Sequence, residues 1–167
     1  ERPVFEGCGN LTTINIGDAV KTIPDYAFYG CRGLKEIAIP NSVTSVGSCA
    51  FSGCTGLTSV TIGNSVTSVG SNAFNSCTGL TSITIPDNSQ LTTVGAYAFE
   101  GCSSLEEVTF HCANVDSWFS GIKTIKQFVL GEEVTSIGGG AFQYCEGLTS
   151  ITVPEGVTAL PESIFSD

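Results

Sequence analysis

The chain is poor in charge and in the residues on which most catalytic sites depend. Its 167 residues include one histidine, one tryptophan, no methionine and six basic residues, against 16 acidic ones. The formal net charge is −10, and residues 36–122 contain no Lys or Arg at all. A phosphate backbone would be repelled along most of such a molecule, so we expect no nucleic-acid partner.

Long hydrophobic runs are also missing. No stretch of 18 or more apolar residues occurs, so we expect no direct insertion into a membrane. The first residues, Glu1 to Val4, lack the basic and apolar segments of a secretion signal, so any such signal is absent or has been removed. The localisation therefore has to be inferred from other features.

The residues that are present offer little for catalysis or for holding a metal. A Ser-His-Asp or Cys-His mechanism would have to use His111, and no glycine-rich phosphate-binding motif accompanies it. No Cys-x-x-Cys pair is present, and we interpret His111 beside Cys112 as part of a surface turn rather than a metal site. We therefore predict no catalytic residues, no cofactor and no metal, and expect the protein not to be an enzyme.

What the sequence has instead is an internal repeat. The segment Val43 to Ile62 recurs as Val66 to Ile85, with each apolar, Cys and Phe position displaced by 23 residues. Self-similarity with a period of roughly 20 to 50 residues is the signature of a solenoid, in which stacked coils share one core. The same frame fits 20–39, 91–110 and 134–153, with half-coils at 5–16 and 157–165.

Three local patterns make up a coil. In Leu57 to Ile62 the apolar Val60 and Ile62 are two positions apart, which indicates a short strand with one buried face. A Pro or Gly then turns the chain, as Gly63 does, and a second extended piece follows. The next slot is Gly in four coils and Pro in two, so we expect negative φ there and a single helical turn through Ala-Phe-x-x-Cys.

The string Leu-x-x-Ile-x-Ile-Pro-x-x-Val-Thr-x-Ile-Gly-x-x-Ala-Phe-x-x-Cys, present in near-identical form at 34–54 and 57–77, resembles the BspA-like (Treponema pallidum-type) bacterial leucine-rich repeat. The resemblance implies a repeat solenoid, a right-handed horseshoe of mostly short parallel β-strands with a short helical turn in each coil. It also implies part of a larger secreted or surface-attached protein of host-associated bacteria, with roles in adhesion. It implies no particular ligand, because such repeats serve many partners.

The whole chain, 1–167, is expected to form a single leucine-rich-repeat domain of about seven coils. One short coil, at 115–133, is irregular because the Ala-Phe-x-x-Cys element is missing. We place Val115 and Trp118 in its first two apolar slots, where other coils have Ile or Val. Trp118 then either fills the space left by the lost turn, together with Phe119, or is an exposed aromatic anchor for a partner.

The cysteines are numerous, and eight in a secreted protein would ordinarily indicate a disulfide framework. Six of them, however, occupy one slot of the repeat, which predicts a column of small buried side chains that point in parallel. We therefore expect free thiols. The six are Cys8, Cys31, Cys54, Cys77, Cys102 and Cys145.

The exposed face of the strand ladder is the main candidate for binding. Stacking in register would form two columns of mostly small polar side chains, which either simply suit an exposed sheet or form a shallow hydroxyl-rich surface for a ligand. Glu106 and Lys126 share a column on neighbouring coils, so they can pair across the ladder. The candidate ligand-binding residues are Glu36, Ser59, Thr61, Ser82, Thr84, Glu106, Glu107, Thr109, Lys126 and, on the irregular coil, Trp118.

Two hypotheses about function follow. The first is a protein- or glycan-binding, adhesive repeat domain of a secreted or cell-surface bacterial protein, located outside the cell, whose partner is a host or bacterial surface protein or glycan. The second is a structural spacer that displays other domains and binds no ligand of its own. The near-identity of the coils at 43–65 and 66–88 favours the spacer, whereas the irregular coil with Trp118 favours recognition.

The two ends of the chain also lead to an expectation. Phe5 and Phe165 both fall in the middle of a coil, and no polar capping unit is visible in the sequence. Because a solenoid needs its terminal coils sealed, we expect either a fragment of a longer array or end-to-end self-association through open ends.

Overall fold

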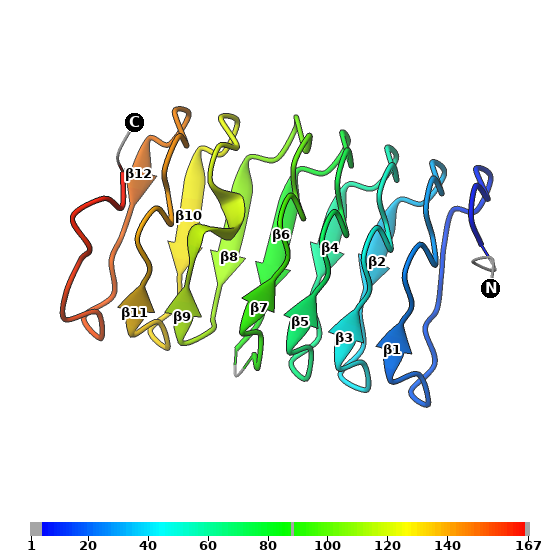
Figure 1. Ribbon diagram of the computed structural model, residues 1–167, viewed down its shortest axis with the longest axis horizontal. Coiled ribbons are helices and arrows are strands. Elements are labelled where there is room, and N and C mark those ends of the chain that lie inside the picture. Colours follow the sequence, from blue (N-terminus) through cyan, green and yellow to red (C-terminus); the bar gives the residue numbers. More distant parts are fainter. Residues whose placement is uncertain (1–4, 88, 166–167) are drawn as a thin grey trace.

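The protein is a parallel β-solenoid with coils of about 23 residues and almost no helix. The computed structural model describes residues 5–87 and 89–165. Figure 1 shows a row of similar coils, with the two termini at opposite ends of the row. The solenoid predicted from the repeat is therefore confirmed.

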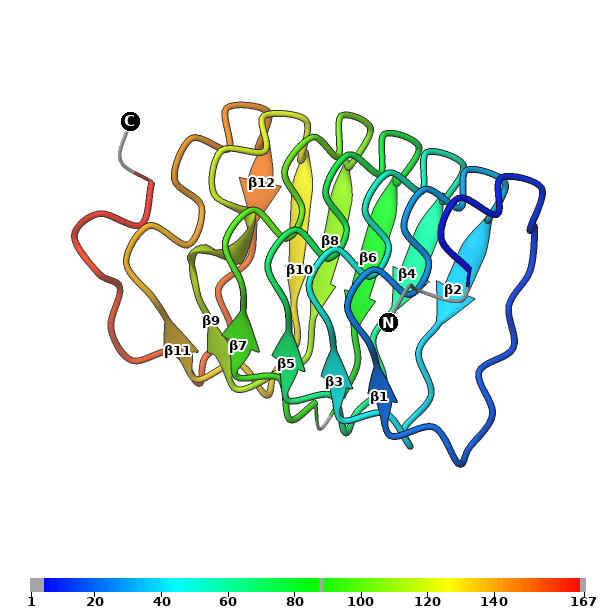
Figure 2. The ribbon, with the colours of Figure 1, turned by 45° about the vertical axis from the view of Figure 1, so that its right-hand side comes forward.

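Each regular coil contributes one strand to each of two ladders, which lie on opposite sides of the coils (Figure 2). The longer ladder has the order β12-β10-β8-β6-β4-β2, and the shorter one has the order β1-β3-β5-β7, with β11-β9 as a separate pair. The strands of the first ladder are β2 (Glu36–Ala38), β4 (Ser59–Thr61), β6 (Ser82–Ile85), β8 (Glu107–Phe110), β10 (Gln127–Leu130) and β12 (Ser150–Ile151). The other strands are β1 (Thr22–Ile23), β3 (Ser45–Val46), β5 (Ser68–Val69), β7 (Thr93–Val94), β9 (Asn114–Val115) and β11 (Ser136–Ile137).

The strand register is set by the length of the repeat. All pairs are parallel, and each residue pairs with its equivalent in the next coil, as Ser59 does with Ser82 and Val60 with Ile83. Such pairing places like residues in columns, so the apolar residue of every strand faces the same core. The strand and the second extended piece predicted for each coil are both confirmed.

Stacked phenylalanines form the centre of the core. The rings of Phe51 and Phe74 are nearly parallel, with centroids 5.1 Å apart, and Phe28 and Phe99 continue the stack at 5.2 and 5.4 Å. Phe51 and Phe74 are completely buried. Burying one such side chain contributes on the order of 1.5 to 3 kcal/mol, so the column is a main source of cohesion between coils.

The cysteines form a second buried column beside the phenylalanines. The thiol of Cys54 donates a hydrogen bond to the carbonyl oxygen of Phe28 at 3.2 Å, and Cys77 does the same to Phe51. Burial raises the pKa of the Cys54 thiol to about 12, so it stays protonated at neutral pH. All eight cysteines are free, including the six that share one slot of the repeat.

The helical turn expected in each coil is not formed, and this part of the prediction is wrong. Positive φ angles at Cys49 (55°) and Gly53 (73°) break the helical path on both sides of Phe51. The backbone N–H of Phe51 donates to the carbonyl oxygen of Ala73 in the next coil, at 2.7 Å, rather than within its own coil. The Ala-Phe-x-x-Cys segment is therefore a series of turns held to its neighbour.

The glycine that precedes these turns is explained by close packing, as predicted. Gly47 is not among the residues with positive φ. A Cβ atom added there would lie 2.5 Å from the backbone nitrogen of Asp25 in the preceding coil, well inside van der Waals contact. The slot is thus limited by the distance between neighbouring coils.

Among the described residues the single helix is the 3-10 turn η1 (Ser117–Phe119), and no helix is long or apolar enough to cross a membrane.

The burial of the thiols generates a labelling prediction. In the native protein at neutral pH, an aromatic disulfide reagent should react rapidly only with the two partly exposed thiols, Cys8 and Cys49, because the others are buried. Denaturant should release all eight. Loss of free thiols in the denatured, unreduced protein would show instead that the column forms disulfides.

Candidate ligand-binding surfaces

The strand face carries the two polar columns predicted from the sequence. The register aligns Glu36, Ser59, Ser82 and Glu107 in one column, and Thr61, Thr84 and Thr109 in the other. Glu36, Thr61 and Glu107 are exposed, whereas Ser59, Ser82, Thr84 and Thr109 are partly buried by their neighbours. A shallow hollow of about 300 Å³ lies over the first strands, lined by Glu36, Ser59 and Thr61 among others.

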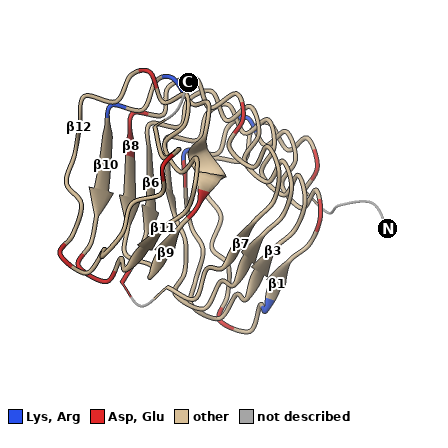
Figure 3. Cartoon of the chain, turned by 60° about the vertical axis from the view of Figure 1, so that its left-hand side comes forward, with Lys and Arg blue, Asp and Glu red and all other residues tan. Residues whose placement is uncertain are grey.

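Charged residues lie mostly at the turns and at the starts of strands, so the rest of each strand is largely uncharged (Figure 3). Lys126 Nζ lies 2.7 Å from Glu106 Oε1, which confirms that this pair meets across the ladder. Both side chains are more than half exposed, so the ion pair contributes at most about 1 kcal/mol. Because Glu106 is paired with Lys126, Glu107 is the acidic side chain that the exposed strand column presents at this coil.

The irregular coil is arranged differently from the expectation. Val115 pairs with Ile137, which puts it in the second apolar slot rather than the first. The first slot is filled by the buried Cys112, which follows Phe110 by two positions, whereas Val66 follows Ile62 by four. Part of the shortening therefore lies before residue 115, in the turn after β8.

Trp118 occupies a slot that the other full coils fill with alanine. Phe119 stacks on Phe99 at 4.5 Å and so continues the phenylalanine column. The residue before that phenylalanine is the buried Ala73 or Ala98 in neighbouring coils, but Trp118 here. Trp118 is only partly buried and packs against Phe110, with ring centroids 6.2 Å apart. The assignment of Trp118 to an Ile or Val slot is therefore wrong. Its indole ring stays partly exposed because an alanine site is too small to enclose it.

The bulky residue coincides with a break in the hydrogen bonds between coils. In the preceding coil the N–H groups of Asn72, Phe74 and Ser76 donate to carbonyl oxygens of the next coil at 2.7 to 3.0 Å. The equivalent N–H groups of Tyr97, Phe99 and Gly101 form no such bond to any residue in the described parts of the chain. The second ladder is interrupted at the same place, since β7 does not pair with β9.

A groove of about 590 Å³ lies at this break. Its walls are the turn at 96–103 and the irregular coil at 117–124. Tyr97, which is 65% exposed, and Trp118 supply aromatic surface, and Glu100 and Lys123 supply charges of both signs. The groove thus combines aromatic rings, hydroxyls and unpaired backbone donors, which are the groups that orient ligands in binding sites.

Comparison with known proteins identifies the family. The model for the BspA-type leucine-rich repeat region matches residues 1–118 and 115–167, with six copies. The chain belongs to this family. No curated protein matches the sequence.

Solved structures of bacterial leucine-rich-repeat proteins are similar to this chain. One, from Eubacterium ventriosum, is 32% identical with a TM-score of 0.73, and the alignment covers 92% of this chain and 41% of that one. Another, from Treponema pallidum, is 26% identical with a TM-score of 0.52, and the alignment covers 78% of this chain and 72% of that one. This chain therefore corresponds to less than half of the E. ventriosum protein.

Within this BspA-type array the predicted residues fall into two separate groups. The strand columns hold Glu36, Ser59, Thr61, Ser82, Thr84, Glu107 and Thr109, with Glu106 and Lys126 beside them, whereas Trp118 lines the groove. Tyr97, the second aromatic residue of the groove, was not predicted from the sequence. Its residue type does not mark it, because Tyr26 holds the same slot in an earlier coil.

The slot assignment generates a stability prediction for the irregular coil. Trp118→Ala should lower the free energy of unfolding by less than about 1.5 kcal/mol, because alanine is the residue that this slot accommodates in other coils. The adjacent Phe119→Ala should cost about 3 to 5 kcal/mol, since it leaves a cavity in the aromatic column. Urea denaturation measures both. Equal losses would show that Trp118 is a core residue like Phe119.

Proposed function

We propose that this chain is a ligand-binding repeat domain of a bacterial surface protein, and that the groove beside Trp118 is its primary contact with a protein or glycan partner. The observation that carries the proposal is the set of three backbone donors in that groove, at Tyr97, Phe99 and Gly101, that have no acceptor among residues 5–87 and 89–165. Unpaired donors are costly unless water or a ligand accepts their hydrogens. A partner with carbonyl, carboxylate or hydroxyl oxygens would supply those acceptors.

The aromatic residues of the groove support the same proposal. Tyr97 is the most exposed of the large hydrophobic side chains in the described residues, with 65% of its surface accessible. Trp118 lies across the groove and is partly open to it. Tyrosine and tryptophan are enriched among residues that dominate binding energy, because they offer a large rigid contact surface.

The strand face is the secondary surface in this proposal. Its hydroxyl columns and Glu107 offer hydrogen-bonding groups without a deep cavity, which suits an extended contact with a large partner. Family membership is consistent with this role, as is a position outside the cell. We infer no catalytic activity.

A spacer without a ligand is the alternative, and one observation favours it. The coils at 43–65 and 66–88 are almost identical, so that part of the molecule presents a uniform surface with no distinct site. In that case the irregular coil would be a tolerated defect, and the groove would hold only water.

Binding of the 167-residue chain to arrays of host and bacterial surface proteins and glycans separates the two functions. We expect at least one specific partner. Tyr97→Ala should weaken its binding by roughly tenfold or more, as for an aromatic hot spot. A Glu106→Lys, Glu107→Lys double variant should weaken it less.

Tyr26→Ala is the matched control. Tyr26 occupies the same slot of an earlier coil, has a similar positive φ (58°) and is also exposed. Its replacement should leave the affinity unchanged. Uniformly blank arrays would favour the spacer, and equal losses from Tyr26→Ala and Tyr97→Ala would exclude the groove as the contact.

A further inference from the structure

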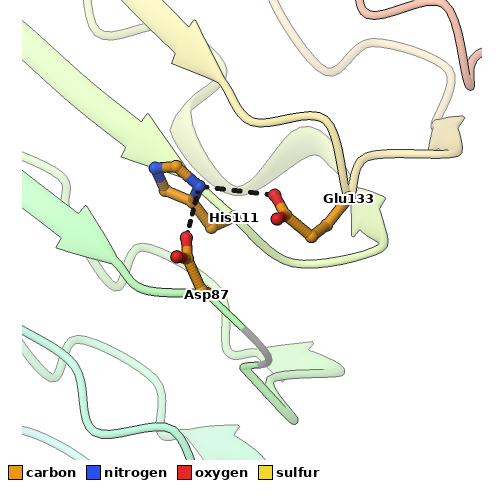
Figure 4. A group of neighbouring side chains, drawn as sticks. All are labelled: Asp87, His111 and Glu133. Atoms are coloured by element: carbon orange, nitrogen blue, oxygen red, sulfur yellow. Dashed lines mark hydrogen bonds and ion pairs between the residues drawn. The ribbon is translucent and has the colours of Figure 1, made fainter.

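Three side chains from successive coils converge on one point at the edge of the solenoid. His111 Nδ1 lies 2.6 Å from Asp87 Oδ1 and 3.4 Å from Glu133 Oε2 (Figure 4). Asp87 follows β6, His111 follows β8 directly, and Glu133 follows β10, so all three occupy the turns that end consecutive strands. Their candidate ligand atoms lie within 4.8 Å of one another.

The backbone at this point leaves room for the cluster. A Cβ atom on Gly131 would lie 2.6 Å from Glu133 Oε2 and even nearer to His111 Nδ1. Any other residue at 131 would therefore displace the two groups. The equivalent slot holds Pro86 in the coil of β6 and Gly63 in the coil of β4, so the repeat accommodates either residue here.

The charges of the cluster are incompletely balanced by the protein alone. His111 Nδ1 carries at most one hydrogen, and Asp87 lies at the distance expected for its acceptor. Glu133 is left at 3.4 Å from the same nitrogen, beside a second carboxylate. Two carboxylates with one imidazole have a net negative charge in either protonation state of the ring. A divalent cation bound to a neutral imidazole would balance both.

We propose that Asp87, His111 and Glu133 bind a divalent transition-metal cation, for which Zn²⁺ is the best match. One imidazole nitrogen and two carboxylate oxygens are ligand types that Zn²⁺ accepts. Tetrahedral bonds of about 2.1 Å put neighbouring ligand atoms roughly 3.4 Å apart, which small side-chain rotations achieve here. The side chains of Asp87 and Glu133 are 65% and 45% exposed, so a further position stays open to water or to a partner's donor group.

The site is independent of the groove at Trp118. The zinc-binding residues lie in the turns that follow the first ladder, whereas the groove lies between the turns at 96–103 and 117–124. Sequence analysis had interpreted His111 as a surface turn without a metal. The two acidic partners were hidden because they are 24 and 22 positions away, about one coil in each direction.

Calorimetric titration of the chain with zinc chloride under reducing conditions tests the proposal. We expect one equivalent to bind to the wild type. His111→Gln and Glu133→Gln should each weaken binding by roughly tenfold or more, because each removes a direct ligand. Glu132→Gln is the matched control, since it removes the same charge from the adjacent exposed residue. It should change the affinity by less than about twofold, because it removes an exposed, solvent-screened charge but no ligand atom.

Substitution with Co²⁺ identifies the ligand atoms. Oxygen and nitrogen ligands should give weak visible bands without the intense near-ultraviolet absorption of a cobalt-thiolate bond. Circular dichroism of each variant checks that the fold is retained. The proposal is overturned by an absence of binding, by equal losses in Glu132→Gln and Glu133→Gln, or by a thiolate band, which would assign the metal to cysteine.

Discussion

Each coil of this molecule buries its apolar face against its neighbours and donates many of its backbone N–H groups to them, while other N–H groups close turns within the coil. The phenylalanine column provides the burial, with ring centroids 5.1 to 5.4 Å apart through the regular coils. The turn amides provide the polar part, since they donate across the interface instead of closing a helix. This shared dependence explains why the repeat is strict. A change of one side chain or one residue in length alters the fit of a whole interface.

The irregular coil shows which contacts between neighbouring coils can be lost while the fold is kept. Phe119 stacks on Phe99, and Phe128 links Phe119 to Phe142, so aromatic contacts still run from one side of the irregular coil to the other. Trp118 takes a position that the other full coils fill with alanine, and the hydrogen bonds from the preceding turn at Tyr97, Phe99 and Gly101 are missing among the described residues. The irregular coil thus weakens the stacking and, at the same place, forms a groove lined by aromatic, charged and hydroxyl side chains. In a repeat protein, such a place is where recognition is most easily added without loss of the fold.

Much of the fold could be predicted because the same pattern of apolar, Cys and Phe positions recurs in coil after coil. The columns of Phe51, Cys54 and Ser59 follow from a 23-residue step and alternating apolar positions, and the structure confirms them. The absence of a helical turn could not be predicted. It depends on positive φ angles at residues such as Cys49, whose identity gives no hint of that conformation. The slot of Trp118 was predicted wrongly because the irregular coil lacks residues both before and after Val115, compared with a regular coil. The sequence alone does not show where each deletion lies, whereas the pairing of Val115 with Ile137 does.

The candidate sites were harder to predict than the fold. Trp118 was recognised as unusual, but its neighbour Tyr97 belongs to the preceding coil and becomes visible only when the coils are stacked. The cluster around His111 has the same origin. A metal site can be recognised from sequence spacing when its ligands lie within a few residues of one another. Here each of the three residues comes from a different coil.

Amide hydrogen exchange resolved by residue tests the central claim most directly, because it compares equivalent N–H groups on two neighbouring coils. The N–H groups of Asn72, Phe74 and Ser76 should be protected, since each donates to the next coil. Those of Tyr97, Phe99 and Gly101 should exchange much faster, because the irregular coil offers them no acceptor among the described residues. Equal protection of the two sets would contradict this account, because it would mean that the coils remain fully paired at Trp118.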